Sequence, residues 1–215
     1  MQTPGNHPLA AKAAPWVAGS FLLVLAVAAL YLFTGAAASE PARTPPPTAD
    51  DISYGPADAS LAVVEYSDFQ CPFCAQYASW LGTLREKYGD RVKFVFRNYP
   101  LANHQYASIA AKAAYAASLQ GKFWEMHDLL FENQKVWSES ADPRPYFDVY
   151  AESLGLDLDQ FHADADAQST TDFIKQQATE GKQGGVTHTP WLVVGDSVVL
   201  PRSLEEFDKL IQEAL

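Results

Sequence analysis

The pattern of hydrophobic and polar positions predicts a strand, a helix and a second strand early in the chain. Residues 61–66 (LAVVEY) form a nearly continuous apolar run, which is typical of a strand covered on both faces. A helix is expected from Pro72 to Tyr88, ending at Gly89, because proline suits a first helical turn and glycine often follows the last one. Residues 91–97 then alternate apolar and basic side chains. This order predicts a βαβ unit with two parallel strands.

Helical periodicity then extends over residues 101–185, where we expect four or five helices. Two short apolar runs on either side of a Gly-Asp pair, within residues 191–200, predict a β-hairpin. The last segment starts with a capping box formed by Ser203 and Glu206, which predicts a C-terminal helix. Together these elements predict one α/β domain with a helical insertion, over residues 52–215.

The N-terminal segment has a different pattern. Residues 1–15 form a short polar tail, and residues 16–34 contain an apolar run of 18 residues without a charge. At about 1.5 Å per residue, a helix of that length nearly spans the ~30 Å hydrocarbon core of a membrane. We therefore expect a transmembrane anchor, and a signal sequence cleaved near Ala38 is the alternative. Residues 35–51 are rich in proline and predict an extended linker that acts as a stalk. Either interpretation places the domain outside the cytoplasm.

The composition adds a strong negative charge. The 215 residues include 26 acidic and 15 basic side chains, for a net charge of −11. Such a surface argues against nucleic acids and anionic lipids as ligands, and solubility is its simplest meaning.

Both cysteines stand in one Cys-x-x-Cys sequence, Cys71-Pro72-Phe73-Cys74, between the first predicted strand and its helix. A disulfide across so small a loop restricts the unfolded chain little, so stability is a poor explanation for the pair. A thiolate at a helix N-terminus is stabilised by unpaired N–H groups and by the helix dipole. The spacing therefore indicates thiol–disulfide exchange. Half of a zinc site and an unused structural pair are the alternatives, and no second ligand pair supports zinc.

Four motifs, in their order and spacing, resemble those of DsbA-type thioredoxin-fold oxidoreductases. They are the Cys-x-x-Cys after an apolar strand, residues 96–101 (FRNYPL), residues 120–127 (QGKFWEMH) and residues 186–190 (VTHTP). The resemblance covers residues 52–215 and implies a thioredoxin fold with a helical insertion. The chain departs from better-known members at Phe73, where they carry His, and at His188, where many carry Gly.

The resemblance implies roles for the residues around the thiols. Cys71 would be the exposed nucleophile and Cys74 the resolving thiol. Pro190 would face the pair after a cis peptide bond, so that the backbone of Thr189 can pair with an extended substrate. Glu65 would accept the proton of Cys74 from beneath the helix. A solvated carboxylate on an edge strand is the other interpretation of Glu65.

Three more residues are expected on the substrate side. Pro72 and Phe73 lie between the thiols, and His188 lies beside the proline loop, where it either stabilises a thiolate when protonated or is simply solvated. Because Phe73 offers Cys71 neither a positive charge nor a polar hydrogen, we expect a milder oxidant than a Cys-Pro-His-Cys enzyme. The remaining histidines of the predicted helices are interpreted as packing or surface residues: His104, His127 and His162.

The expected function is an extracytoplasmic oxidoreductase that donates the Cys71–Cys74 disulfide to folding exported proteins. No dissociable cofactor and no metal are implied. The resemblance further implies a quinone-linked membrane thiol oxidase as the partner that restores the disulfide. Two other functions stay open: a reductase or isomerase of the same fold, and a non-catalytic holdase that binds peptides at the Pro190 loop.

Overall fold

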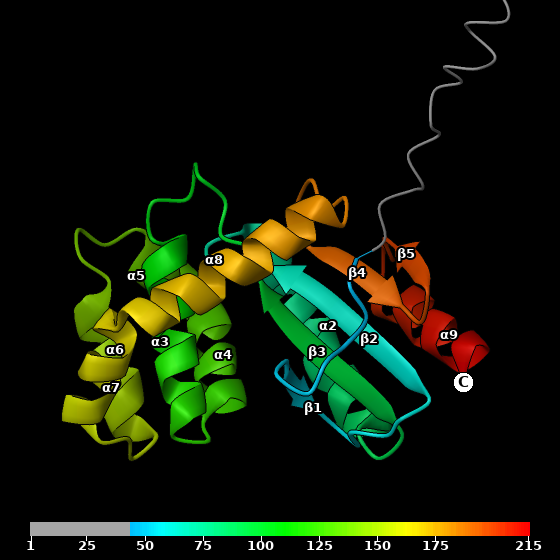
Figure 1. Cartoon of the computed structure of the whole chain (residues 1–215), viewed down its shortest axis with the longest axis horizontal. Coiled ribbons are helices and arrows are strands. Elements are labelled where there is room, and N and C mark those ends of the chain that lie inside the picture. Colours follow the sequence, from blue (N-terminus) through cyan, green and yellow to red (C-terminus); the bar gives the residue numbers. More distant parts are fainter. Residues whose placement is uncertain (1–43) are drawn as a thin grey trace, which may run out of the picture. The chain divides into compact units, whose positions relative to one another are not determined.

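The computed structural model describes residues 44–215, in which five strands form one sheet in the order β1-β3-β2-β4-β5 (Figure 1). The strands β2 (Leu61–Ser67) and β3 (Val92–Asn98) are parallel and are joined by α2 (Pro72–Tyr88), which confirms the predicted βαβ unit. The strand β4 (Trp191–Val194) runs antiparallel to β2. It continues into β5 (Ser197–Val199), which confirms the predicted hairpin. The strand β2, which leads to the cysteines, is therefore central.

The two ends of the domain differ in how well local sequence patterns predict them. The final helix α9 (Leu204–Ala214) has the Ser203 half of the predicted capping box, because the Ser203 side chain accepts a hydrogen bond from the N–H of Glu206. The Glu206 carboxylate accepts from the N–H of Arg202 and not from that of Ser203. The edge strand β1 (Ile52–Tyr54), antiparallel to β3, was not predicted. Its three residues are too few to show an alternating pattern.

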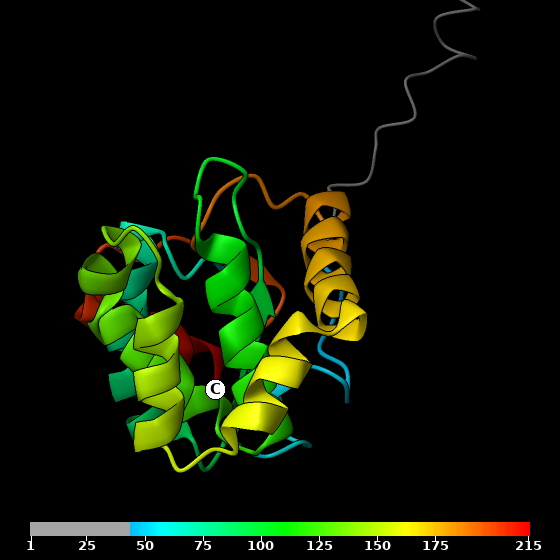
Figure 2. The same ribbon diagram turned by 90° about the vertical axis from the view of Figure 1, so that its left-hand side faces the viewer.

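Within the described chain, six helices lie between β3 and β4, so the expected four or five were too few. They are α3 (Ala107–Leu119), α4 (Phe123–Glu132), α5 (Gln134–Ser138), α6 (Arg144–Ser153), α7 (Leu158–Asp166) and α8 (Gln168–Gln183). The five residues of α5 are too short for a helical period to be recognised. Helices α3 to α7 gather beside the sheet (Figure 2), where the buried alanines of α3 let α4 and α7 approach closely.

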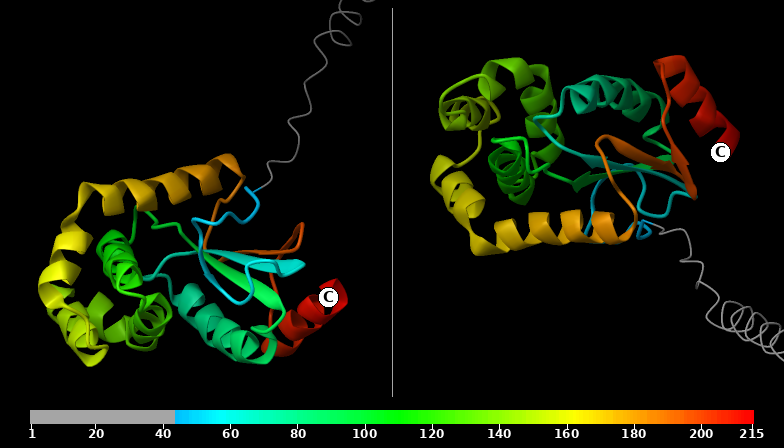
Figure 3. Two further views of the ribbon diagram at one scale, coloured as in Figure 1. Left: turned by 60° about the horizontal axis from the view of Figure 1, so that its bottom comes forward. Right: turned by 90° about the horizontal axis from the view of Figure 1, so that it is seen from above.

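Helices cover both faces of the sheet. Figure 3 shows α2 and α9 on one face and α8 on the other. Side chains alternate along β2, so Glu65 points to the α2 face and Tyr66 to the α8 face. Helix α8 includes Gly181, where a Cβ would lie 2.7 Å from the Tyr66 ring, so glycine lets the helix pack closely against this face. The active-site strand therefore sends successive side chains into two separate cores.

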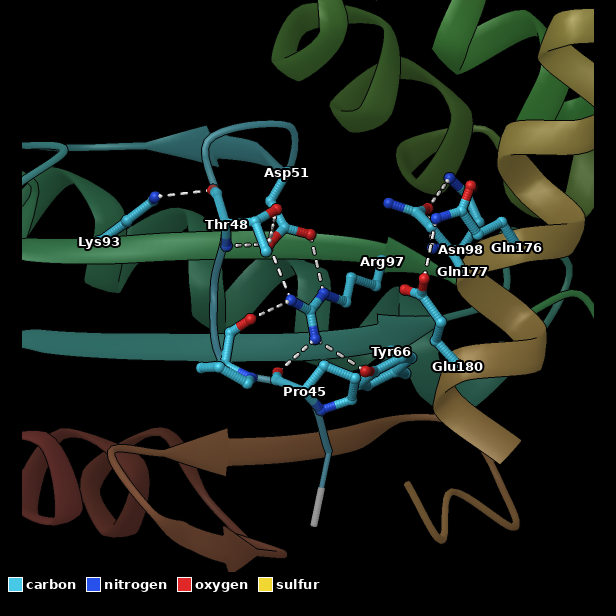
Figure 4. Close-up of polar contacts among 11 residues, drawn as sticks. Pro45, Thr48, Asp51, Tyr66, Lys93, Arg97, Asn98, Gln176, Gln177 and Glu180 are labelled. Atoms are coloured by element: carbon cyan, nitrogen blue, oxygen red, sulfur yellow. Dashed lines mark hydrogen bonds and ion pairs between the residues drawn. The ribbon is translucent and has the colours of Figure 1, made fainter. Parts of the chain in front are cut away.

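The predicted tail, span and cleavage site, within residues 1–38, lie outside the described residues. Across residues 44–215, no helix is both long enough and apolar enough to cross a membrane. The end of the predicted linker 35–51 packs against the domain, because Arg97 donates hydrogen bonds to the carbonyl oxygens of Pro45 and Pro46 (Figure 4). These two prolines therefore belong to the folded unit and are not part of a free stalk.

Candidate active site

The two thiols lie at the N-terminus of α2. Cys71 is the N-cap, with an extended backbone (φ −76°, ψ 122°), and Pro72 opens the helix as predicted. The backbone N–H groups of Phe73 and Cys74 hydrogen-bond toward the Cys71 sulfur. Both cysteines are free, so the structure shows the dithiol form of the pair.

The two sulfurs ionise very differently. The hydrogen bond with the Cys74 side chain, opposed by burial, lowers the pKa of Cys71 to about 5. A contact with Thr189 and the N–H groups of the first helical turn lower it further. The pKa of Cys74 is raised well above its usual range, first by burial and then by the Cys71 sulfur and the Glu65 carboxylate. At neutral pH this arrangement favours a thiolate at Cys71 and a thiol at Cys74.

The loop before β4 covers the Cys71 sulfur. The peptide bond between Thr189 and Pro190 is cis, and Cys71 Sγ lies 3.5 Å from the carbonyl oxygen of Thr189. His188 is exposed, with its ring 5.1 Å from that of Trp191. The expectation of an exposed nucleophile is wrong for the side chain as a whole, because the loop leaves Cys71 only 4% exposed.

A groove of about 540 Å³ lies beside this loop. Its lining includes Phe73, Tyr77, Trp80, His188, Pro190 and Leu200. Phe73 is 67% exposed, and Pro72 is exposed outside the groove. Trp80 and Leu200 were not predicted to lie at the site, because a single apolar residue at a helix surface or strand end carries no pattern.

Glu65 is buried beneath α2. Its side chain is 3% exposed and accepts a 2.8 Å hydrogen bond from Ser67 Oγ. Burial raises the pKa of Glu65 to about 7, against the opposing effects of Ser67 and of the Arg85 charge. The interpretation of Glu65 as a solvated residue on an edge strand is wrong, because β2 pairs with β3 on one side and β4 on the other.

Two residues that the sequence analysis did not connect with the thiols share this buried space. Arg85 of α2 and His127 of α4 line a small cavity together with Glu65. Asp128 contacts both, at 2.8 Å from Arg85 Nη2 and 2.7 Å from His127 Nδ1. His127 does pack among aromatic rings, as predicted, but it also belongs to a charged cluster. Its position within the FWEMH motif was the one signal for it.

Of the other two histidines expected in helices, His104 precedes α3 and His162 lies in α7. His104 is half-buried, with Nδ1 2.8 Å from the carboxylate of Asp68, and His162 is exposed beside Asp148. Among residues 44–215, no group of three or more His, Cys, Asp or Glu side chains is placed to hold a metal ion.

Solved structures share this fold. The thiol-disulfide exchange protein α-DsbA2 of Wolbachia pipientis has a TM-score of 0.67 and 21% identity, covering 76% of this chain and 86% of that one. A thioredoxin-like oxidoreductase from Silicibacter pomeroyi has a TM-score of 0.65 and 25% identity, covering 78% of this chain and 93% of that one. Oxidised BdbD from Bacillus subtilis has a TM-score of 0.67 and 23% identity, covering 80% of this chain and 97% of that one. These structures share the thioredoxin-like fold of this chain.

Sequence comparisons identify a family and a longer protein that resembles this chain over part of its length. The Na⁺/H⁺ antiporter NhaA of Herminiimonas arsenicoxydans is 35% identical over 151 residues, which cover 69% of this chain and 23% of the antiporter. The chain thus spans less than a quarter of that relative's length, and the antiporter's activity is not carried over to it. A family model described as thioredoxin matches residues 48–213. Because this match covers well over half of the chain, the protein belongs to the thioredoxin family.

Proposed function

We propose that this protein is an extracytoplasmic thiol–disulfide oxidoreductase that forms disulfides in exported proteins by donating its Cys71–Cys74 disulfide. The observation that supports this direction is the opposite displacement of the two pKa values, lowered at Cys71 and raised at Cys74. A stabilised Cys71 thiolate favours the reduced enzyme, which makes the disulfide form an oxidant.

The reaction proceeds by two thiol–disulfide exchanges. A substrate thiolate attacks Cys71 Sγ, the Cys71–Cys74 bond breaks, and Cys74 leaves as a thiolate that takes up a proton. A second substrate thiolate then attacks the substrate sulfur of the mixed disulfide, and Cys71 leaves as a stable thiolate. Two electrons pass from the substrate to the enzyme pair, and no dissociable cofactor takes part.

The groove and the Thr189 backbone would hold the substrate. An extended segment can pair with the backbone of this loop, next to the exposed His188, with little dependence on sequence. An apolar side chain of the segment can then enter the groove beside Phe73 and Leu200, both of which are exposed. His188 at the rim is available for a polar contact. This mode of binding suits unfolded chains with exposed apolar residues.

The N-terminal segment would hold the domain at the outer face of the membrane. Residues 16–34 form the anchor in this proposal, and cleavage near Ala38 would instead release a soluble domain. A quinone-linked membrane thiol oxidase would accept two electrons from the dithiol and restore the disulfide. N-terminal sequencing of the mature protein distinguishes anchoring from cleavage.

An equilibrium titration against glutathione buffers tests the direction of electron flow. We expect a reduction potential between those of DsbA, about −120 mV, and thioredoxin, about −270 mV. Iodoacetamide should alkylate Cys71 with a midpoint near pH 5, where its thiolate forms. A potential at or below that of thioredoxin favours the reductase alternative. Alkylation no faster than that of an ordinary peptide thiol at pH 7 contradicts the proposed function.

The holdase alternative is favoured by the apolar groove alone, and it needs no thiol. Replacement of either cysteine in cells, by Cys71→Ser or Cys74→Ser, separates the two functions. We expect exported proteins to accumulate in reduced form in both variants. Unchanged oxidation of exported proteins would support the holdase.

A further inference from the structure

A small cavity of about 10 Å³ lies beneath the active-site helix. Three polar side chains from three different elements line it: Glu65 of β2, Arg85 of α2 and His127 of α4. The apolar part of its lining includes Leu81, Phe94 and Trp124. A cavity of about this volume holds one water molecule if two to four polar partners surround it. The three polar side chains meet that requirement.

Two atoms of these side chains are buried without a hydrogen-bond partner among residues 44–215, Arg85 Nη1 and His127 Nε2. The His127 side chain is 1% exposed, so bulk solvent does not satisfy it. Buried polar atoms in folded proteins nearly always have a partner from the protein or from ordered water. Both unpaired atoms belong to side chains that line this one cavity, which points to a ligand of the cavity's size.

The two unpaired atoms are complementary. The Asp128 carboxylate lies 2.7 Å from His127 Nδ1, so Nδ1 carries the proton and Nε2 is an acceptor. Arg85 is always a donor. A single water can therefore accept from Arg85 Nη1 and donate to His127 Nε2 and to the Glu65 carboxylate. Asp128 continues the path outward, because its side chain is 44% exposed.

We propose that one water molecule in this cavity joins Glu65 to His127, and that the two side chains pass the Cys74 proton to Asp128 at the surface. The proposal rests on the proposed function, because it concerns the same dithiol. It assigns Arg85 and His127 to the reaction as positioning and relay residues, in addition to the cysteines.

The step is clearest when the enzyme is reoxidised by a disulfide. In the mixed disulfide between Cys71 and the oxidant, Cys74 gives its proton to Glu65 by way of the Ser67 hydroxyl, which hydrogen-bonds both groups, and its sulfur attacks Cys71 Sγ. The Cys71–Cys74 bond forms, the bond to the oxidant breaks, and the oxidant's sulfur leaves as a thiolate with the electron pair. The proton moves through the water to His127 Nε2, and the Nδ1 proton leaves through Asp128. Substrate oxidation runs the same path in reverse.

The surroundings of His127 suit a relay. The charged groups that face it are Glu65 from β2, Arg85 from α2 and Asp128 from its own helix. Burial and the Arg85 charge lower the pKa of His127, while Asp128 acts in the opposite direction. The imidazole therefore stays neutral at neutral pH and does not retain the proton that it receives. The rest of its surroundings is aromatic: Phe69, Phe96, Phe123, Trp124 and Phe131.

The variant His127→Phe tests the relay, because the aromatic surroundings can accept a ring that has no nitrogen. Reduced protein is mixed with oxidised glutathione, and the closure of the Cys71–glutathione disulfide to Cys71–Cys74 is followed by acid quench between pH 5 and 9. We expect closure at pH 7 to be at least tenfold slower in the variant. Its pH profile should move upward, because Cys74 then has to lose its proton without the relay.

The matched control is His162→Phe. His162 also pairs with a carboxylate, with Nε2 2.8 Å from Asp148 Oδ1, but it does not line this cavity. The rate of disulfide closure in His162→Phe should stay within twofold of the wild-type rate at each pH. Equal slowing in both variants would overturn the relay, because the effect would then not depend on the cavity.

Equal closure rates and pH profiles in the wild type and His127→Phe would also overturn the proposed relay. If His127→Phe does not fold, Asp128→Asn serves instead, since Asp128 is half-exposed. We expect closure three- to tenfold slower in that variant, and unchanged closure overturns the relay. The alkylation rate of Cys71 keeps the two proposals apart. Fast alkylation together with unchanged closure removes the relay and leaves the proposed function standing.

Discussion

Each face of the sheet buries a charged side chain, and the two differ in how completely their charges are paired. On the α8 face, Arg97 binds Asp51 through two hydrogen bonds of 2.8 Å and the Tyr66 hydroxyl through a third. Its remaining donors reach the carbonyl oxygens of Pro45 and Pro46 (Figure 4). All five donors of the guanidinium are used, so this cluster fastens the N-terminal segment to the sheet.

On the α2 face the pairing is incomplete. Glu65 accepts one side-chain hydrogen bond, from Ser67, and two polar atoms nearby, on Arg85 and His127, have no partner within the described chain. Incomplete pairing of a buried carboxylate is costly. The comparison indicates that the complete cluster stabilises the fold, whereas the incomplete one keeps a proton mobile beside the thiols.

The largest effect is expected from Arg97→Met, which should lower the free energy of unfolding by about 3–5 kcal/mol because Asp51 then stays buried without its counter-charge. Urea unfolding at pH 7 measures this, and Cys71 alkylation should not change. Lys93→Met is the matched control on the same strand, since Lys93 contacts the Thr48 carbonyl at the surface, and it should cost less than about 0.5 kcal/mol. A loss below about 1 kcal/mol in Arg97→Met would contradict the comparison.

The ion pair between Arg97 and Asp51 predicts that the loss of stability in Arg97→Met depends on pH. Burial acts to raise the pKa of Asp51, but the hydrogen bonds and charge of Arg97, with help from Thr48, outweigh it and lower the pKa. A carboxyl with a lowered pKa stabilises the folded state above its unfolded pKa, and this contribution is lost as the pH falls through the folded pKa. The deficit of Arg97→Met should therefore shrink in acid.

Glu65→Gln should stabilise the folded protein, in contrast to Arg97→Met, which destabilises it. Because burial raises the pKa of Glu65 to about 7, from 4.5, its ionisation destabilises the folded protein as the pH rises through this window. The variant should be more stable than the wild type by roughly 3 kcal/mol at pH 8, and by little at pH 4.5. Urea unfolding of the reduced proteins at both pH values measures this.

Glu86→Gln is the control for that variant, because Glu86 is exposed on α2. It should change the stability by less than about 0.5 kcal/mol at either pH. A stability gain in Glu65→Gln that does not depend on pH would show that ionisation of Glu65 is not the cause.

The smallest effect is expected from Ser67→Ala. The hydrogen bond from Ser67 favours the ionised form of Glu65, so its loss should raise the pKa of Glu65 by about one unit. Carbon-13 NMR of the Glu65 carboxyl measures this shift. Ser153→Ala is the control, since Ser153 bonds only a carbonyl of its own exposed helix turn. An equal pKa in wild type and Ser67→Ala would mean that this hydrogen bond does not influence the pKa of Glu65.

Local signals were sufficient for much of the fold. Proline at the start of α2, alternation along β3 and the Gly-Asp pair between β4 and β5 each act within a few residues, so they can be recognised without a structure. The three residues of β1 and the five of α5 are too short to carry such a signal. The docking of Pro45 depends on Arg97, 52 residues away, and no local pattern announces it.

The amino-acid order alone places two thiols one helical turn apart at a helix start, and thiol exchange follows from that chemistry. Tertiary packing decides how the thiols ionise and where their proton goes. It brings the Thr189 carbonyl 3.5 Å from a sulfur 118 residues away, and it gathers Glu65, Arg85 and His127 around one cavity. A pKa depends on burial and on nearby charges, and both are set by segments far apart in the chain.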